Sequence, residues 1–408
     1  MNNSGVSSHH PGLADGPIYL DYNATTPVDA RVAEAALPYL TTHFGNPSSG
    51  HAYAEQPRRA LAEARQQLAD LIGGQPAEIV FTAGGSEADN LAIRGTALAH
   101  EGAAPAQIIT QASEHPAVLE ACRALQRLHG VQVRYLPVDR DGLVDPAALA
   151  DALTPETVLV SIMAANNETG VLQPITELAG IAHARGVLFH TDAAQAAGKI
   201  PIDATAWGVD LLTIAGHKMY APKGIGALYV RAGVRLEPLV YGGGQERGLR
   251  AGTESVALAV ALGAAAQLAL TELGARGADR IRSLRDLLHH RLDELLPGRV
   301  QLNGHRDQRL PNTLNVSITG VIGENLLAAT PGIAAATGSA CHTGTPAPSP
   351  VLLAMRHDPG RALSALRLTL GRWTTRDDIE QAAHHIAAGT LVAHPTATLT
   401  AGRSAESI

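Results

Sequence analysis

The sequence predicts an α/β fold, in which helices cover both faces of a mostly parallel sheet. Between residues 78 and 230, short apolar runs alternate with segments whose apolar residues recur at helical spacing. Glycines and prolines separate these segments, and an alternation of strands and helices is typical of parallel sheets. The chain has 408 residues, 45% of them hydrophobic, so it can bury a large core and a second, smaller one.

The positions of the apolar runs and breakers predict the individual elements. Strands are expected at residues 78–82, 107–111, 131–136, 158–164, 187–191, 211–215 and in a run that ends at Val230. Helices are expected at residues 28–40, 55–72, 86–100, 116–129, 146–153 and 174–185. Long helices at 255–270 and 278–296 then precede short strands at 312–318, 333–337 and 365–370 and a last helix from about Thr375.

This organisation predicts two domains between two tails. The large domain is expected over residues 17–270 and a smaller α/β domain over residues 271–394. The ends, residues 1–16 and 395–408, are rich in small and polar residues, so disordered tails are expected there.

Composition argues against several classes of function. The formal net charge is −7 and no basic run occurs, so no nucleic-acid-binding surface is expected. Two cysteines, Cys122 and Cys341, are too few for a disulfide framework and indicate a reducing compartment. The N-terminus lacks a secretory signal and no apolar run is expected to approach a membrane span, which together predict a cytoplasmic protein without membrane contacts.

Lys218 is the strongest candidate for catalysis. It follows the apolar run 211–215 and precedes a turn rich in proline and glycine, so it is expected at the mouth of the sheet with little solvent around it. Burial disfavours a charged ammonium, and a neutral amine can form a Schiff base with a carbonyl cofactor. Only three of the 31 basic residues are lysines, so positive charge alone would not require lysine here. Composition alone accounts for the other two, Lys199 and Lys223.

Polar clusters follow five of the expected strands. They are residues 83–87 (AGGSE), 114–115 (EH), 166–168 (NNE), 192–195 (DAAQ) and 216–218 (GHK). Ligands of parallel sheets bind outside the carboxyl ends of the strands. We therefore expect the five clusters to converge on one site.

In this order the clusters resemble those of the cysteine desulfurases and selenocysteine lyases, class V members of the fold-type I enzymes that use pyridoxal 5′-phosphate (PLP). The resemblance extends from Tyr19 to about Glu380. Nine collinear blocks match: LDYNATTP (20–27), FGNPSSGH (44–51), FTAGGSEADN (81–90), EHPAV (114–118), NNETG (166–170), HTDAAQAAGK (190–199), GHKMYAPKGIGALYV (216–230), GGGQERGLRAGT (242–253) and GSAC (338–341). The resemblance implies a large PLP-binding domain with a mostly parallel seven-stranded sheet, a smaller domain that carries Cys341, and an N-terminal arm near residues 17–27 on the small domain.

The resemblance assigns contacts with the PLP ring to four residues. Lys218 would hold PLP as a Schiff base, Asp192 would pair with the pyridinium nitrogen, and Gln195 would bind the ring oxygen. The alternatives are an exposed turn carboxylate for Asp192 and a surface amide for Gln195. His115 would stack on the ring and move protons, although a lone histidine is more often structural.

The phosphate of PLP would lie at the start of a helix that Gly85 and Ser86 open with free N–H groups. Ser86 could instead serve as an N-cap only, and the two roles can coexist. His217 would be the phosphate-side neighbour of Lys218, and Thr253 would reach the phosphate from the second subunit of a homodimer. Ala215 stands where most desulfurases have a phosphate-binding serine, so one phosphate contact is expected to be missing.

Substrate contacts are implied for three residues. Arg367, in an apolar strand, would bind the substrate carboxylate with its guanidinium fork. Asn167 would contact either the ring oxygen or the substrate. Cys341 lies in a loop of small residues, where its thiolate could take the sulfur of a substrate cysteine as a persulfide. The alternative is an inert thiol, which is the expectation for Cys122. No metal site is expected.

The sequence therefore predicts a PLP-dependent desulfurase that converts L-cysteine to L-alanine and delivers sulfur from Cys341 to an acceptor protein of unknown identity, with iron–sulfur cluster assembly as one destination. The alternative is a selenocysteine lyase acting on L-selenocysteine. A non-catalytic scaffold is disfavoured because Lys218, Asp192, Cys341 and Arg367 are all present. A plain aminotransferase is disfavoured because it would have no use for Cys341.

Overall fold

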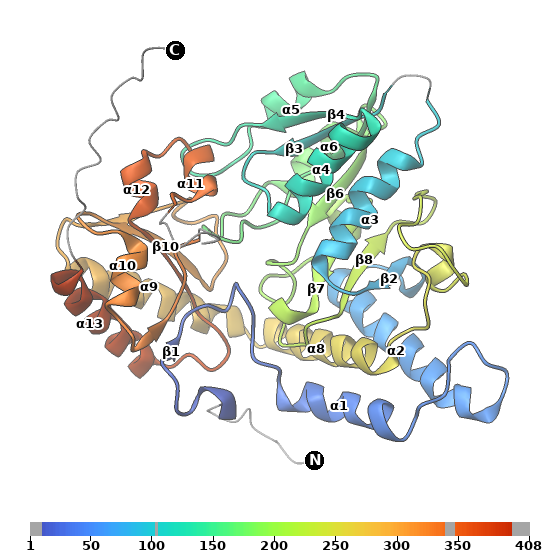
Figure 1. The fold of residues 1–408 in the computed structure, drawn as a ribbon, viewed down its shortest axis with the longest axis horizontal. Helices are drawn as coiled ribbons and strands as arrows, with labels where there is room; N and C mark the ends of the chain where they lie inside the picture. The colour runs from blue at the N-terminus through green and yellow to red at the C-terminus, as the bar shows by residue number, and fades with distance from the viewer. Residues whose placement is uncertain (1–9, 103–104, 339–346, 394–408) are drawn as a thin grey trace, which may run out of the picture.

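The computed structural model describes residues 10–102, 105–338 and 347–393. Its large domain is built on a seven-stranded sheet in the order β2-β8-β7-β6-β5-β3-β4 (Figure 1). Only β8 runs antiparallel to its neighbours, so the predicted mostly parallel sheet is confirmed. The strands are β2 (Ile79–Thr82), β3 (Gln107–Gln111), β4 (Gln132–Leu136), β5 (Thr157–Ser161), β6 (Leu188–Asp192), β7 (Leu211–Ala215) and β8 (Gly226–Val230).

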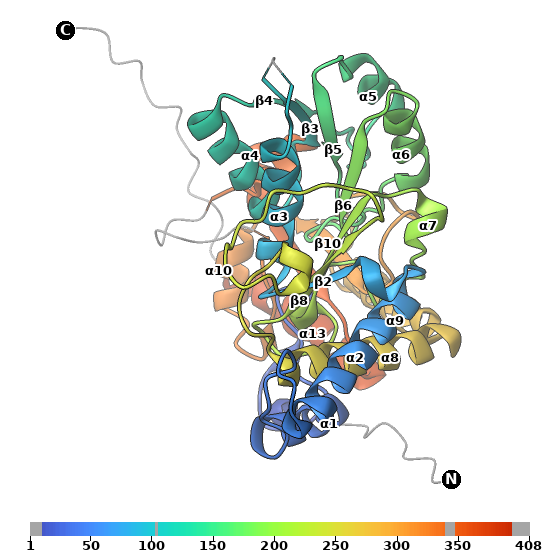
Figure 2. The same ribbon diagram turned by 90° about the vertical axis from the view of Figure 1, so that its right-hand side faces the viewer.

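Helices cover both faces of this sheet (Figure 2). On one face, α3 (Gly85–Leu98) and α4 (Pro116–His129) share a core with strand residues such as Val80 and Ile108. The neighbouring residues Phe81 and Ile109 point to the opposite face, because successive side chains of a strand alternate. That second core includes α1 (Ala30–Thr41), α2 (Glu55–Ile72), α5 (Pro146–Ala152), α6 (Ile175–His183), α7 (Ala204–Trp207) and α8 (Val256–Gly274).

A third core belongs to the smaller domain. Its antiparallel sheet has the order β12-β10-β9, with β9 (Val300–Leu302), β10 (Thr313–Ile318) and β12 (Ala365–Thr369). Around it lie α9 (Gly277–Leu295), α10 (Gly323–Ala328) and α13 (Arg376–Val392), while α11 (Pro350–Ala354) and α12 (Pro359–Leu363) lie toward the large domain. The sequence pattern missed β9, α7, α10, α11 and α12, all of them too short to show periodicity.

The N-terminal arm lies on the small domain. Strand β1 (Ile18–Tyr19) pairs in parallel with β11 (Ile333–Ala334), and Leu20 is fully buried in the small-domain core. Residues 10–16 are described as well, so assigning them to a disordered tail was wrong. His10 accounts for their order, because its Nε2 lies 3.0 Å from the carbonyl oxygen of Val28 and its ring packs against Trp373.

Helix α8 connects the two domains and corrects two expectations. The expected boundary at 270/271 falls inside this helix, which continues to Gly274. With 19 residues, α8 is also long and apolar enough to cross a membrane. The expectation that no apolar run has the length and composition of a membrane span was therefore wrong. In the fold, α8 packs against α1 and α2, and half of it is buried in protein, as in the core helix of a globular domain.

Candidate active site

A cavity of about 740 Å³ lies at the carboxyl edge of the large sheet. Strands β2, β3, β5, β6 and β7 all end at this edge because they run in the same direction. Each of the five polar clusters contributes to the lining, with Ser86, His115, Asn167, Asp192 and Lys218 among the contributors. The predicted convergence of five clusters on one site is therefore confirmed.

One wall of the cavity is the N-terminus of α3. Gly84 precedes the helix with φ 154° and ψ −179°, a conformation that glycine adopts and other residues avoid. Gly84 is the N-cap, so Ser86 lies inside the first turn, and the alternative that Ser86 is an N-cap was wrong. The N–H groups of a first helical turn have no intrahelical acceptor and attract anions. Ala215 packs closely against this first turn, because a Cβ added to Gly85 would lie only 3.2 Å from the Ala215 side chain.

Lys218 lies in a short 3₁₀ turn, η4 (Gly216–Lys218), directly after β7. Its Nζ donates hydrogen bonds to the carbonyl oxygens of Asn23 and Ala24, both at 2.7 Å. Burial, together with the positive charge of Arg367, lowers the pKa of Lys218 to about 8. A substantial fraction of Lys218 is therefore a free amine just above neutral pH.

Asp192 ends β6 and lies 6% exposed on the floor of the cavity. Its Oδ1 accepts the N–H of Ala194 at 2.8 Å, and burial raises the pKa of its carboxyl group. Glu114 and Asp89, both buried nearby, also have a raised pKa because of burial and the charge of Asp192. A cationic group placed against Asp192 would compensate this excess of buried acid.

His115 is the N-cap of α4, and its Nδ1 accepts the N–H of Ala117 at 3.1 Å. Burial lowers the pKa of His115. The ring is thus neutral, and because Nδ1 accepts, Nε2 bears the proton. A residue of the N-terminal arm holds His217, whose Nδ1 lies 3.2 Å from Thr25 Oγ1. Burial lowers the pKa of His217 to about 4.

Asn23 is the residue of the site that sequence reasoning missed. Its carbonyl oxygen accepts from Lys218 and, at 3.0 Å, from Nε2 of Gln195. Its side-chain Oδ1 accepts from Lys199 at 3.4 Å and from Asn312 at 3.0 Å. Asn23 therefore joins the arm, the large domain and the small domain. Its place in the matching block LDYNATTP was the only signal in the sequence.

Gln195 and Lys199 are also linked to each other. Lys199 Nζ donates to Gln195 Oε1 at 2.8 Å, and burial lowers the pKa of Lys199 well below its usual value. Attributing Lys199 to composition alone was therefore incomplete. Gln195 is 5% exposed and lines the cavity, so the alternative of a surface amide was wrong.

Arg367 lies on β12 and is 8% exposed. Its Nη2 pairs with Asp21 Oδ1 at 2.7 Å, and its Nη1 donates to the carbonyl oxygen of Asn167 at 3.3 Å. The Nε of Arg367 and the Oδ1 of Asn167 are buried and have no partner among the described residues. Neighbouring Glu168 accepts from Ser349 Oγ at 2.5 Å, and burial raises its pKa to about 7.

The structure does not bring every predicted residue to the cavity. Arg367 and Thr253 are both absent from the lining of the described single chain, and Thr253 is exposed. Cys341 lies outside the described residues, between Gly338 and the residues that resume at 347. Cys122 is fully buried in α4, and burial raises the pKa of its thiol to about 12, which agrees with the inert role expected for it.

Comparison with known families now assigns the chain. Residues 18–382 match the family model described as "Aminotransferase class-V". The chain belongs to the class-V aminotransferase family. Among the relatives of this class-V chain is the cysteine desulfurase IscS of Rickettsia bellii, which is 46% identical over 369 residues, or 90% of this chain and 89% of the relative.

Solved structures agree with this assignment of the class-V chain. A NifS-like protein superposes with a TM-score of 0.84 at 35% identity, covering 91% of this chain and 98% of its own. SspA in complex with cysteine superposes with a TM-score of 0.77 at 35% identity, covering 88% and 99%.

Class-V aminotransferases depend on PLP, and the residues of this cavity fit that group. The first turn of α3 offers N–H groups to a phosphate, and buried Asp192 suits a protonated ring nitrogen. Asn167 Oδ1 is a buried acceptor without a partner, which a bound group can satisfy. Lys218 supplies the amine that a carbonyl cofactor requires.

Proposed function

We propose that this protein is a PLP-dependent cysteine desulfurase, which converts L-cysteine to L-alanine and transfers the sulfur to Cys341 as a persulfide. The observation that supports it best is the amine of Lys218, which is held by two carbonyl oxygens beside buried Asp192 and the first turn of α3. When bound, PLP supplies an electron sink next to the Cα of the amino acid.

Arg367 orients the substrate by its carboxylate. Its guanidinium is fixed by Asp21 and by the carbonyl oxygen of Asn167, so it offers a rigid fork with Nε still unpartnered. A bidentate contact with a carboxylate fixes direction as well as position. The arm supplies Asp21 and Asn23, so the arm, β12 and the loop after β5 together set the pose of the substrate.

Lys218 moves protons and His115 orients the substrate. Lys218 has a pKa of about 8, so near this pH its amine can take a proton from Cα and return it. His115 bears its proton on Nε2 and can donate a hydrogen bond from there to the substrate. Burial lowers the pKa of His115 and so favours the neutral ring in this role.

The sulfur step balances without an added oxidant. The thiolate of Cys341 attacks the substrate Sγ, an S–S bond forms, and the Cβ–Sγ bond breaks. The electron pair of that bond stays on Cβ, which takes a proton and becomes the methyl group of alanine. The products are alanine and a persulfide on Cys341.

We further propose that the enzyme is a homodimer and delivers sulfur to an acceptor protein. Thr253 is exposed and does not line the cavity of its own chain, as expected for a residue that completes the phosphate site of a second copy. The cytoplasm remains the expected compartment. The selenocysteine lyase alternative is not favoured, because relatives at 45–46% identity are cysteine desulfurases.

Substitution of Cys341 by serine tests the sulfur step. We expect Cys341→Ser to keep the visible absorbance of bound PLP and to lose sulfide release from L-cysteine in the presence of a thiol reductant. Alanine and sulfide are measured with cysteine and selenocysteine in parallel, with Cys122→Ser as the matched control. Full turnover of cysteine by the Cys341 variant would contradict the persulfide step, and a strong preference for selenocysteine would contradict the assigned substrate.

A further inference from the structure

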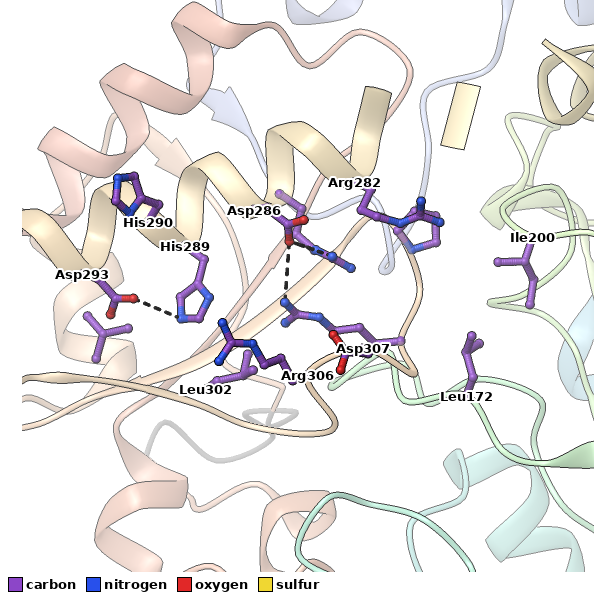
Figure 3. A pocket seen from close by; sticks show the side chains of 14 residues that line it. Leu172, Ile200, Arg282, Asp286, His289, His290, Asp293, Leu302, Arg306 and Asp307 are labelled. Carbon is purple, nitrogen blue, oxygen red and sulfur yellow. Dashed lines mark hydrogen bonds and ion pairs between the residues drawn. The ribbon is translucent and has the colours of Figure 1, made fainter. Parts of the chain in front are cut away.

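A second cavity, of about 920 Å³, lies between the two domains and away from the candidate active site. Helix α9 and the loop after β9 supply most of its lining, including Arg282, His289 and Arg306. Figure 3 shows these side chains on one side, with Leu172 and Ile200 of the large domain on the other. The proposed catalytic function assigns no role to this cavity.

Arg309 is the unusual residue of the cavity. Its side chain is only 4% exposed, and its Nε and Nη1 have no hydrogen-bond partner among the described residues. Its Nη2 lies 3.7 Å from Asp286 Oδ1, which is an ion pair without a hydrogen bond. A buried guanidinium without hydrogen bonds is costly, and the loss is recovered when an anion accepts from it.

Arg309 is nevertheless rigidly placed. The N–H of Leu172 donates to the carbonyl oxygen of Gln308 at 3.0 Å, and the N–H of Leu310 donates to that of Gly170 at 2.8 Å. These bonds fix the backbone on both sides of Arg309 to the large domain. The backbone position of Arg309 is therefore set before any ligand arrives, which lowers the entropic cost of binding.

The lining of the cavity contains four arginines and three aspartates, so its formal charge is slightly positive. Arg285 contacts Asp286 at 2.7 Å and donates to the carbonyl oxygen of Leu310, so Asp286 is already neutralised. Arg306 is exposed and has no partner among the described residues. Burial and the charge of Arg285 lower the pKa of Arg309 to about 10. Burial, and after it the charges of Arg309 and Arg306, lower the pKa of His289.

We infer that this cavity binds a small phosphorylated molecule, whose phosphate oxygens accept from Arg309 and Arg306. Several guanidinium groups around one cavity suit the dense charge of a phosphate, which each can bind through two parallel N–H groups. Leu172, Ile200 and Pro311 form an apolar wall that accommodates the organic part of the molecule. Asp307 also belongs to the lining, so we place the phosphate on the arginine side of the cavity.

Isothermal titration of the holoenzyme with inorganic pyrophosphate tests this site, because bound PLP keeps the cofactor's own phosphate site filled. Measurements at 0.15 M salt suppress binding to the exposed surface. We expect saturable binding to the wild-type enzyme and at least tenfold weaker binding to Arg309→Gln and Arg306→Gln. Arg127→Gln, which removes an exposed arginine on α4, is the matched control and binds as the wild type does.

Arg306→Gln keeps the test valid if the buried variant fails to fold, since Arg306 is exposed. Citrate at equal concentration separates phosphate from carboxylate recognition and is expected to bind at least tenfold more weakly than pyrophosphate. Absence of saturable binding to the wild type, equal binding by the Arg306 variant and the control, or equal affinity for citrate would each overturn the inference. None of these measurements uses turnover, so they stand apart from the proposed catalytic function.

Discussion

Two lysines lie on either side of Asn23, and their surroundings differ in one decisive respect. Lys218 donates to the backbone carbonyl oxygens of Asn23 and Ala24 and lines the cavity that contains His115 and Asp192. Lys199 donates to the side-chain oxygens of Asn23 and Gln195 and lines a separate cavity of about 270 Å³. Burial lowers the pKa of both. A lowered pKa therefore does not identify the reactive lysine; its position beside an acid and a helix N-terminus does.

Replacing each of the two lysines in turn tests which of them is the reactive one. We expect Lys218→Ala to reduce turnover by about 10²- to 10⁴-fold, because a positioned acid–base group contributes this much. The visible absorbance of a covalent cofactor adduct is lost as well. Lys223→Ala, an exposed lysine that lines the same cavity, is the control and keeps both signals. An adduct that survives in Lys218→Ala would move the reactive amine elsewhere.

Arg367 acts on both the substrate and Lys218. Arg367→Gln is expected to raise KM for cysteine roughly 10- to 100-fold, the loss that about 1.5–3 kcal/mol for a charge-assisted hydrogen bond predicts. The variant also raises the pKa of Lys218, since the charge of Arg367 is the second cause of its lowering. Steady-state kinetics and a pH titration of the variant measure the two effects. An unchanged KM would remove Arg367 from the substrate site.

The pH dependence of cofactor attachment measures whether the pKa of Lys218 is that of an ordinary lysine or of a buried one. Only the free amine attacks a carbonyl, so the attachment rate rises with pH and levels off above the pKa of Lys218. With a pKa of about 8, the rate falls about tenfold per pH unit below that value. Stopped-flow absorbance of the cofactor-free enzyme mixed with PLP measures the profile. A midpoint near the ordinary lysine value of 10.5 would show that Lys218 is not desolvated.

The smallest effect is expected at Lys199. Lys199→Met leaves Gln195 Oε1 without its donor at 2.8 Å but keeps the cofactor amine intact. We expect a full covalent adduct and a turnover reduced by less than about tenfold, since one neutral acceptor is left unsatisfied. Cofactor stoichiometry and kcat are the readouts. A loss as large as that of Lys218→Ala would reverse the roles of the two lysines.

Regular elements of the large domain were predictable from local pattern. The expected bounds of α2, α4, β3 and β7 coincide with the observed ones. The two helices have clear periodicity, and the two strands are short buried runs that end at polar or glycine residues. Strand β9 and helix α10 were missed because three or six residues contain too little pattern. The positions of the five polar clusters were also predictable, because each cluster directly follows an apolar run in the sequence.

Contacts between distant segments were not predictable in this way. Asn23 meets Lys218 across 195 positions of the sequence, and Asp21 meets Arg367 across 346. Such contacts depend on how the arm packs on both domains, which no local pattern encodes. The buried guanidinium of Arg309 is another example. Its lack of hydrogen-bond partners depends on how α9, the loop after β9 and the large domain pack together.

The covalent site itself can be measured directly. Borohydride reduction of the PLP-loaded enzyme, followed by digestion and mass spectrometry, fixes the cofactor on the lysine that holds it. The account predicts a reduced pyridoxyl adduct on the peptide that contains Lys218 and none on the peptide that contains Lys199. An adduct on Lys199, or no adduct in a PLP-saturated sample, would contradict it.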